Sequence, residues 1–309
     1  MHAVRIHSFG EADVLKVEEV PPPEAKDNEI VVRVMAASVN PVDFKIRSGK
    51  YPAVKEDQLP MVLGRDISGV VERVGGNVRK FKKGDAIYAM LGSDIGGYAE
   101  FTLVTEDEAA KKPPQLDFVQ AAAVPLAALT AWQGLFDHGG LKAGQRVLIH
   151  GGAGGVGHFA IQFAKAKGAW VATTVSGEDI ALAHKLGADQ PIDYKKERFE
   201  DVAKDIDLVY DLIAGDTQKR SFAVLKDGGT LISTLQKPDD AELARKHARG
   251  AHYLAKPNAR ELEEIAALIE AGDVRVVVNA IYPLEDAARA HKHMECDHIA
   301  GKVVLQVAA

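Results

Sequence analysis

Five glycines stand in the seven positions 151–157, which read GGAGGVG. The apolar run Val147-Leu148-Ile149 precedes them, and the helix-like sequence HFAIQFAKAKGA follows. Three of the glycines fit the spacing G-x-G-x-x-G, which between a strand and a helix is typical of dinucleotide binding: Gly152, Gly154 and Gly157. We therefore predict that this loop binds a dinucleotide.

The physical basis of this prediction is the backbone of the loop. Where side chains are missing, the N–H groups of Gly154, Gly155 and Val156 can approach a pyrophosphate, and the positive end of the following helix favours its charge. Gly157 allows that helix to pack closely on the sheet. We expect these N–H groups to be the pyrophosphate contacts.

The end of the next expected strand, 170–175, bears on which nucleotide is bound. An NAD site usually places Asp or Glu roughly 20 residues beyond the glycines, where it accepts from the ribose 2′-hydroxyl. Here Ser176 follows the strand, and a neutral hydroxyl can donate to a 2′-phosphate, which favours NADPH over NADH. Glu178 and Asp179 would repel that phosphate if they faced it; alternatively, they form the acidic first turn of the next helix.

The glycine-rich loop opens a series of alternating strands and helices that runs from about residue 122 to residue 271. Six strands separated by helices predict a parallel, doubly wound sheet, with ligands at the carboxyl ends of its strands. Residues that follow the fourth and fifth strands are therefore expected at the cofactor: Ile213, Ser233 and Leu235. The expected strands are 147–150, 170–175, 190–192, 207–212, 230–235 and 251–254.

The rest of the chain has a different pattern of apolar and polar residues. Residues 1–121 contain short alternating runs separated by Gly, Pro and Asn turns, which predict a β-rich, barrel-like lobe. Residues 272–309 read as strand, helix and strand. Because about 40 residues bury too little surface to be stable alone, we expect this tail to return to the first lobe.

Length and composition restrict the class of protein. A chain of 309 residues predicts two domains. The net charge of −6 and the pI near 6.0 offer no basic face for nucleic acid or an anionic membrane. The longest apolar stretch, 121–132, is shorter than the roughly 20 residues of a membrane span. The first ten residues lack the regions of a signal peptide, so we expect a cytoplasmic protein with small-molecule partners.

A cluster of histidines near the C-terminus has the donor atoms of a metal site. It reads HKHMECDH at 291–298. On a helix, His291 and His293 would lie about 200° apart, so they would not converge on one ion. Cys296 is the single cysteine, which excludes an internal disulfide and a four-thiolate zinc site. We predict no metal here and interpret the segment as a polar helix end.

Several blocks in order resemble the medium-chain dehydrogenase/reductase superfamily, in particular its zinc-independent quinone oxidoreductase branch, which includes zeta-crystallin and alkenal reductases. The blocks are GEADVLKVEEV, SVNPVDFKIRSGKYP, PMVLGRDISGVVERVG, PLAALTAWQGL, VLIHGGAGGVGHFAIQFAKAKGA, LGADQPIDY and GKVVLQV. The resemblance covers nearly the whole chain. It implies a GroES-like β-barrel lobe at 1–121, a Rossmann domain at 122–271 and a return of 272–309 to the first lobe, with the active site between the lobes.

The resemblance also bears on whether a catalytic zinc ion is expected. The alcohol dehydrogenases of this superfamily hold zinc with a Cys and a later Gly-His-Glu, whereas this chain has Asn40 and Gly64-Arg65-Asp66. Neither thiolate nor imidazole is present at these positions. We therefore expect hydride transfer without a metal, and we expect Asp43, Lys45 and Arg65 to form structural ion pairs.

The remaining site residues come from the resemblance. Asn40 and Tyr51 are the implied catalytic residues, because an amide and a phenol beside the nicotinamide can donate to a substrate oxygen. Thr130 is implied near the nicotinamide, Tyr194 near the adenosine 2′-phosphate, and His298 in a segment that passes the cofactor.

These observations predict an NADPH-dependent reductase of quinones or of the activated C=C bond of α,β-unsaturated carbonyls. One alternative is a carbonyl or alcohol dehydrogenase. Another is a non-catalytic NADPH-binding protein of the redox-sensor or crystallin kind. The family's habit of pairing sheet edges further implies a homodimer through the sixth strand, near 251–254.

Overall fold

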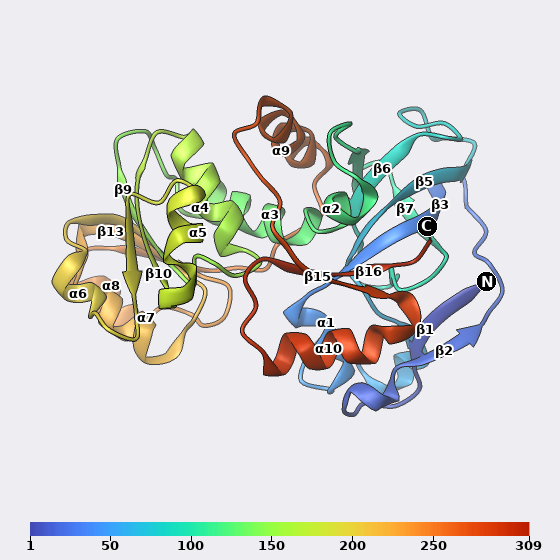
Figure 1. The fold of residues 1–309 in the computed structure, drawn as a ribbon, viewed down its shortest axis with the longest axis horizontal. Coiled ribbons are helices and arrows are strands. Elements are labelled where there is room, and N and C mark those ends of the chain that lie inside the picture. The colour runs from blue at the N-terminus through green and yellow to red at the C-terminus, as the bar shows by residue number, and fades with distance from the viewer. Residues whose placement is uncertain (309) are drawn as a thin grey trace. The chain divides into compact units, whose positions relative to one another are not determined.

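A computed structural model describes residues 1–308, which divide into two compact units (Figure 1). Unit 1 contains Met1–Leu126, Pro257–Glu270 and the chain from Val276 to the end of the described residues. Unit 2 contains Ala127–Lys256 and Ala271–Arg275. In the described chain, no helix has the length and apolar character that a membrane crossing requires.

Unit 2 is built on a six-stranded parallel sheet with the order β11-β10-β9-β12-β13-β14. This is the predicted doubly wound sheet, in which the first strand lies in the middle and the order reverses beside it. The apolar run Val147–Ile149 is fully buried in the central strand. The strands are β9 (Arg146–His150), β10 (Trp170–Val175), β11 (Gln190–Asp193), β12 (Ile206–Asp211), β13 (Leu225–Ser233) and β14 (Arg249–His252).

Short helices connect these strands. α4 packs on β9 and β10, α5 on β10 and β11, and α7 on β12. The helical elements are α3 (Pro125–Trp132), whose first two residues belong to unit 1, a π-helical turn at Gln133–His138, α4 (Gly157–Ala166), a 3₁₀ turn at Gly177–Asp179, α5 (Ile180–Lys185), α6 (Phe199–Val202), α7 (Gly215–Ser221) and α8 (Asp240–Arg245).

Unit 1 is the predicted β-rich lobe. A larger sheet has the order β15-β16-β3-β5-β6-β8, with β7 paired to β3, and a small sheet has the order β2-β1-β4. The strands are β1 (His2–Ile6), β2 (Lys16–Glu19), β3 (Glu29–Val39), β4 (Met61–Val62), β5 (Asp66–Val74), β6 (Ala86–Met90), β7 (Phe101–Thr105), β8 (Ala109–Lys111), β15 (Val278–Pro283) and β16 (Lys302–Gln306).

The helices of unit 1 lie around these sheets. They are α1 (Pro41–Arg47), α2 (Phe118–Ala122), α9 (Ala259–Ala271) and α10 (Ala287–Cys296), with 3₁₀ turns at Ala12–Val14, Glu56–Gln58 and Leu284–Asp286.

The C-terminal segment returns to the first lobe, as its length led us to expect. β16 pairs antiparallel with β3, with Val303 opposite Val39 and Leu305 opposite Ala37. Apolar residues of β3 and β16 enter one hydrophobic cluster with the small sheet and α10. This burial supplies the apolar contacts that the segment could not provide alone.

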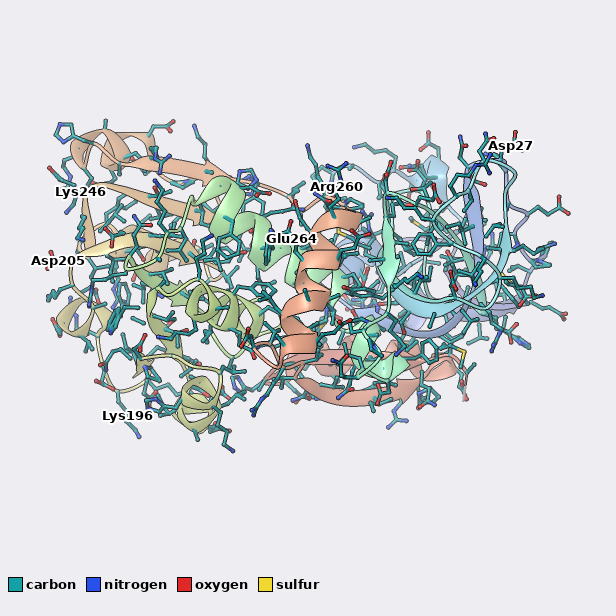
Figure 2. The ribbon with its side chains drawn as sticks, turned by 90° about the horizontal axis from the view of Figure 1, so that it is seen from above. Asp27, Lys196, Asp205, Lys246, Arg260 and Glu264 are labelled. Atoms are coloured by element: carbon teal, nitrogen blue, oxygen red, sulfur yellow. The ribbon has the colours of Figure 1, made fainter. Side chains whose placement is uncertain are left out.

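The division of the chain differs from the expected boundaries at 121/122 and 271/272. The first boundary falls at 126/127, inside α3, and most of α9 belongs to unit 1 rather than to the nucleotide unit. Two hydrogen bonds explain the position of α9: the Tyr88 hydroxyl donates to the Leu262 carbonyl (2.5 Å), and the Ala259 N–H donates to the Asp107 carbonyl (2.9 Å). In Figure 2, Arg260 and Glu264 are labelled on this helix.

Candidate functional site

The glycine-rich loop connects β9 to α4 in a conformation that requires glycine at two positions. A Cβ at Gly152 would lie 1.9 Å from Thr173 Oγ1, and a Cβ at Gly157 would lie 2.1 Å from the Gly151 carbonyl oxygen. Both distances are far below any real contact, so the loop closes tightly on β10 and on the first turn of α4. The sequence motif therefore reflects a steric need.

The N–H groups of Gly155 and Val156 are among those of the loop that remain available to a ligand. The Gly154 N–H donates to the Gly151 carbonyl (3.1 Å), so this expected pyrophosphate donor is already used inside the loop. Within the described chain, the N–H groups of Gly155 and Val156 have no hydrogen-bond partner. They precede α4, where the helix dipole favours an anion, and they fit a pyrophosphate.

The surroundings of Ser176 differ in part from the expectation. The Ser176 hydroxyl donates to Asp179 Oδ2 (2.8 Å), and Asp179 is only 6% exposed. Of the two acidic residues, Glu178 is exposed as predicted for an outward first turn, whereas Asp179 turns toward Ser176. A 2′-phosphate at Ser176 would therefore meet a hydroxyl whose proton is already shared with a carboxylate.

Tyr194 and two lysines lie next to this strand end. The Tyr194 N–H donates to the Val175 carbonyl (3.1 Å), which places Tyr194 one hydrogen bond from the end of β10. Its ring is 56% exposed. Lys195 and Lys196 follow it, both largely exposed, and Figure 2 shows Lys196 at the surface. This edge thus combines an accessible phenol with two cations.

Two further loops at the carboxyl edge carry predicted cofactor contacts. Asp211 Oδ1 accepts the N–H groups of Ile213 (3.0 Å) and Ala214 (2.8 Å), which fixes the loop after β12. Ser233 Oγ accepts the N–H of Leu235 (3.2 Å), so its hydroxyl shapes the loop after β13. Both Ile213 and Leu235 expose large parts of their side chains, at 52% and 44%. The loops therefore present apolar side chains at the edge where a doubly wound sheet binds its ligand.

Thr130 is held through its carbonyl group. The hydroxyls of Tyr210 on β12 and Tyr253 after β14 lie 2.9 Å and 2.5 Å from this oxygen and 2.5 Å from each other, so their two hydrogens are shared among three contacts. Burial raises the pKa of both Tyr210 and Tyr253 above the usual range of a phenol, so both hydroxyls stay protonated. No sequence pattern indicates this pair, which ties α3 to β12 and to the residue that follows β14.

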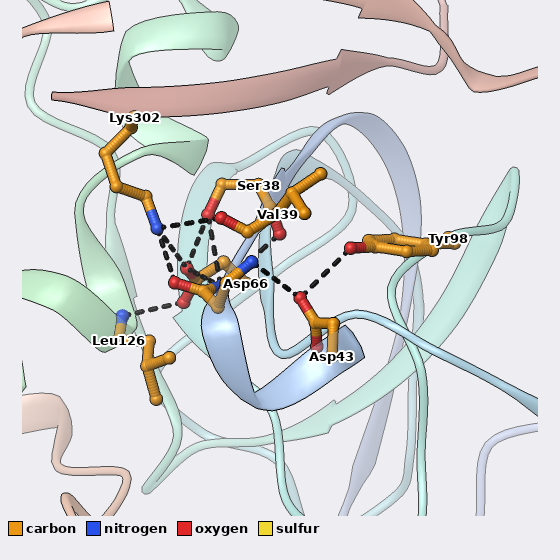
Figure 3. A network of polar contacts seen from close by, with 8 residues as sticks. Ser38, Val39, Asp43, Asp66, Tyr98, Leu126 and Lys302 are labelled. Carbon is orange, nitrogen blue, oxygen red and sulfur yellow. Dashed lines mark hydrogen bonds and ion pairs between the residues drawn. The ribbon is translucent and has the colours of Figure 1, made fainter. Parts of the chain in front are cut away.

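The other predicted residues lie in unit 1, where Asn40 belongs to a buried polar network with Asp66 and Lys302, both labelled in Figure 3. Lys302 is 1% exposed. Its ammonium group donates a hydrogen bond to Asn40 Oδ1, and its Nζ lies 3.7 Å from Asp66 Oδ2. The Asn40 amide donates to the same Asp66 oxygen at 2.9 Å. The Asn40 oxygen and one amide hydrogen are thus engaged, and the amide nitrogen also lies 3.4 Å from the Ser38 carbonyl and hydroxyl oxygens.

Asp66 is the common acceptor of the network. Its Oδ2 also accepts from the Ser38 hydroxyl (2.6 Å), and its Oδ1 accepts from the Leu126 N–H (2.6 Å) in the first turn of α3. Burial lowers the pKa of Lys302, while Asp66 raises it. A buried carboxylate with this many donors is a stable partner for a buried ammonium.

A second series of hydrogen bonds starts at Asp43 and ends at Arg47, which is 1% exposed. Asp43 Oδ2 accepts from the Asn40 N–H (2.8 Å) and from the Tyr98 hydroxyl (3.0 Å). Tyr98 contacts His291 Nε2 (3.2 Å), and His291 Nδ1 lies 3.2 Å from Arg47. Because arginine only donates, His291 Nδ1 accepts and its Nε2–H donates to Tyr98.

The electrostatics of this chain differ from the expected ion pair at Asp43. Asp43 is fully buried with no cation within ion-pair distance in the described chain, and its Oδ1 has no hydrogen-bond partner. Burial raises its pKa to about 7. Burial, with a smaller contribution from Arg47, lowers the pKa of His291 to about 3. The expectation of a structural ion pair was therefore wrong for Asp43, which is held by neutral donors.

Tyr51 and His298 are the remaining predicted residues of unit 1. Tyr51 is half-buried against the hydrophobic cluster of unit 1, and its hydroxyl has no hydrogen-bond partner among residues 1–308. His298 is exposed, just beyond α10. His291 and His293 diverge as predicted, because His293 Nδ1 contacts the Tyr282 hydroxyl (3.1 Å) instead. No group of three metal-ligating side chains occurs in the described part of the chain.

The sequence did not predict three residues of this network: Lys302, Tyr98 and His291, whose buried ring connects Tyr98 to Arg47. Lys302 stands in the block GKVVLQV, and a lysine beside an apolar strand was the one available signal. Its role depends on Asn40 and Asp66, which are more than 230 positions earlier in the chain.

Comparisons with known proteins agree with this architecture. Residues 26–114 match the alcohol dehydrogenase GroES-like domain, and residues 186–305 match the zinc-binding dehydrogenase family. The NADPH-dependent alkenal/one oxidoreductase, chloroplastic, of Arabidopsis thaliana is 38% identical over 96% of this chain and 77% of its own length.

Two solved structures are similar along their whole length. The quinone oxidoreductase of Coxiella burnetii has a TM-score of 0.93 and 37% identity, and covers 99% of each chain. The Escherichia coli quinone oxidoreductase complexed with NADPH has a TM-score of 0.90 and 31% identity, over 99% of this chain and 100% of its own. The fold and its relatives define a medium-chain dehydrogenase/reductase. Within that superfamily, the chain belongs to the quinone oxidoreductase and alkenal reductase family.

The name of one matched family implies zinc, and the residues here do not fit it. The Lys302 ammonium contacts the Asn40 oxygen and lies beside the Asp66 carboxylate, the two oxygen ligands that this region offers. A metal cation placed there would be repelled by the ammonium and would lack the thiolate and imidazole donors that zinc prefers.

We predict that Lys302→Met lowers the free energy of unfolding by about 3–5 kcal/mol, because it leaves the Asp66 carboxylate buried without its cation. Urea denaturation measures the change. Lys83→Met is the matched control: Lys83 pairs with Glu72 at 2.6 Å on the surface, where the loss is much smaller. Equal effects of the two substitutions would contradict the anchoring role of Lys302.

Asp43 should make stability depend on pH. Its folded-state pKa lies above the ordinary 3.8, so its contribution is fully present below about pH 4 and is lost as pH rises through about 7. A difference of about 3 pH units at ~1.4 kcal/mol each gives on the order of 4 kcal/mol. Relative to the wild type, Asp43→Asn should therefore gain stability between pH 4 and pH 8.

Denaturation curves at several pH values test this expectation. Asp27→Asn serves as the control, because Asp27 lies exposed at the surface (Figure 2). If the Asp43→Asn curve stays parallel to the wild-type curve over this range, Asp43 is ionised throughout and the expectation is wrong.

Proposed function

We propose that this protein is an NADPH-dependent reductase that transfers hydride, without a metal, to quinones or to the activated C=C bond of α,β-unsaturated carbonyls. The observation that carries the proposal is the pair of unpartnered N–H groups, Gly155 and Val156, at the start of α4. The relatives supply the substrate class, because their names state alkenal/one and quinone oxidoreductase activity.

Residues of unit 2 would hold the nucleotide. The N–H groups of Gly155 and Val156 fit the pyrophosphate, and the exposed side chains of Ile213 and Leu235 offer apolar contacts. Tyr194, with Lys195 and Lys196 after it, would bind the 2′-phosphate by hydrogen bonding and charge. When bound, NADPH supplies the hydride.

Residues of unit 1 would serve the substrate. Conjugation in an enone or quinone moves the developing negative charge to an oxygen, which a positioned donor stabilises. Tyr51 offers an unpartnered hydroxyl for this purpose. Asn40 would act by holding the start of α1 in place, since Lys302 and Asp66 engage its carboxamide. Thr130 and His298 are proposed near the cofactor on resemblance alone.

The assembly and location of the protein are part of the same proposal. β14 is an edge strand of its sheet and is followed by Leu254, whose side chain is 61% exposed. An exposed apolar residue beside an unpaired strand edge favours pairing with a second copy, so we propose a homodimer. We also propose that the protein acts in the cytoplasm.

The function is tested by NAD(P)H oxidation with a panel of enones, quinones, aldehydes and ketones. We expect turnover with enones or quinones, faster with NADPH than with NADH, and unchanged after dialysis against a chelator. Turnover restricted to aldehydes or ketones would support a carbonyl dehydrogenase instead. Tight NADPH binding without turnover of any compound would support a non-catalytic role.

Tyr51→Phe should lower kcat by about 100-fold, because it removes one donor to the developing oxyanion. The dissociation constant of NADPH, measured by fluorescence, should stay unchanged. Tyr282→Phe is the matched control in unit 1, since its hydroxyl contacts only His293 among the described residues. Wild-type kcat in Tyr51→Phe would remove Tyr51 from the catalytic assignment.

A further inference from the structure

His150 is the last residue of β9 and directly precedes the glycine-rich loop. Its ring is fully buried and lies edge-on against Phe199, with centroids 4.7 Å apart. Its Nε2 is 2.9 Å from Ser221 Oγ on α7, and its Nδ1 is 3.1 Å from Thr174 Oγ1 on β10. A buried imidazole with both nitrogens engaged needs matched donors and acceptors.

The placement of the hydrogen in each of these hydrogen bonds follows from the carbonyl group that ends the series. A carbonyl oxygen can only accept, so the Ser221 hydroxyl donates its single proton to the Thr217 carbonyl (2.7 Å). Ser221 Oγ must therefore accept at the other contact, and His150 carries its proton on Nε2. This assignment leaves the Nδ1 lone pair free to accept from the Thr174 hydroxyl.

Thr174 connects the ring to the loop. Its Oγ1 accepts the N–H of Gly151 at 3.3 Å, and its carbonyl accepts the N–H groups of Gly151 and Gly152, both at 3.1 Å. With its own proton directed to His150 Nδ1, the oxygen presents a lone pair to Gly151. The donors thus follow one direction, from the loop through β10 and β9 to α7.

We propose that His150, as a neutral ring protonated on Nε2, is a positioning residue that holds the glycine-rich loop in its nucleotide-binding conformation through Thr174. This inference rests on the proposed function, because it concerns how the loop binds NADPH. The ring touches no ligand itself. It fixes the orientation of the Thr174 hydroxyl and thereby the first residue of the loop.

The environment of the ring agrees with a neutral state. Burial lowers the pKa of His150 to about 4, with Asp211 and Glu200 acting to raise it and Arg220 to lower it. A proton on Nδ1 as well would force the Thr174 hydroxyl to turn away, and the described residues offer that hydroxyl no other acceptor.

The ring state is measured directly by ¹⁵N NMR of histidine-labelled wild-type protein. His150 is assigned by the loss of its signals in His150→Gln. We expect ¹⁵N shifts of the neutral Nε2–H tautomer between pH 6 and pH 8. The Nδ1–H tautomer, or a charged ring in this range, would overturn the proposal without any functional variant.

The effect on the loop is measured with Thr174→Val, which keeps the β-branched shape and removes the hydroxyl. We expect the dissociation constant and the KM of NADPH to rise about three- to tenfold, with kcat close to wild type. Thr230→Val is the matched control, because Thr230 is also a buried threonine of this sheet and contacts only Arg249 through its hydroxyl.

The outcomes separate this proposal from the proposed function. If Thr174→Val binds NADPH as tightly as Thr230→Val, the positioning role is wrong while the NADPH-dependent function stands. If both variants lose kcat and stability together, the chain of contacts serves folding and the positioning role is again wrong. If the wild type itself does not bind NADPH, the proposed function fails and the role of His150 fails with it.

Discussion

A buried ammonium ion is the constraint on which the rest of unit 1 depends. Removing a charge from water costs several kcal/mol, and the cost is offset only by a well-placed countercharge and further hydrogen bonds. Lys302 meets this need with Asp66, the Asn40 carboxamide and the Val39 carbonyl (3.3 Å). The last strand of the chain is thereby fixed to β3, to the start of α1 and to β5. The same contacts engage the Asn40 and Asp66 oxygens, which a metal would need as ligands.

Directional hydrogen bonding gives both units their internal order. In unit 1 the donors run from Arg47 through His291 and Tyr98 to Asp43, and in unit 2 from Gly151 through Thr174 and His150 to Ser221. Each of these two series of hydrogen bonds contains one imidazole whose pKa is lowered by burial. A neutral imidazole both donates and accepts, so it can link two polar groups inside an apolar core at no cost in buried charge.

Each unit contains candidate residues whose polar groups are fixed within the fold and others whose polar groups are free. The Asn40 amide in unit 1 and the Ser176 hydroxyl in unit 2 each donate to a carboxylate of their own unit. The N–H groups of Gly155 and Val156 are free, and so is the Tyr51 hydroxyl in the described chain. Within each unit, groups held by the fold before a ligand arrives are preorganised.

The sequence by itself determined the features that depend on neighbouring residues. The glycine spacing, the six strands of unit 2 and the alternating runs of the first lobe follow from local sterics and periodicity, and the structure confirms the resulting fold. Only the tertiary structure decided that Lys302 reaches Asn40, that Asp179 turns toward Ser176, that α9 joins unit 1, and which nitrogen of His150 carries the proton. These depend on contacts between residues far apart in the chain or on the side-chain geometry of a folded turn, and neither leaves a regular pattern in the sequence.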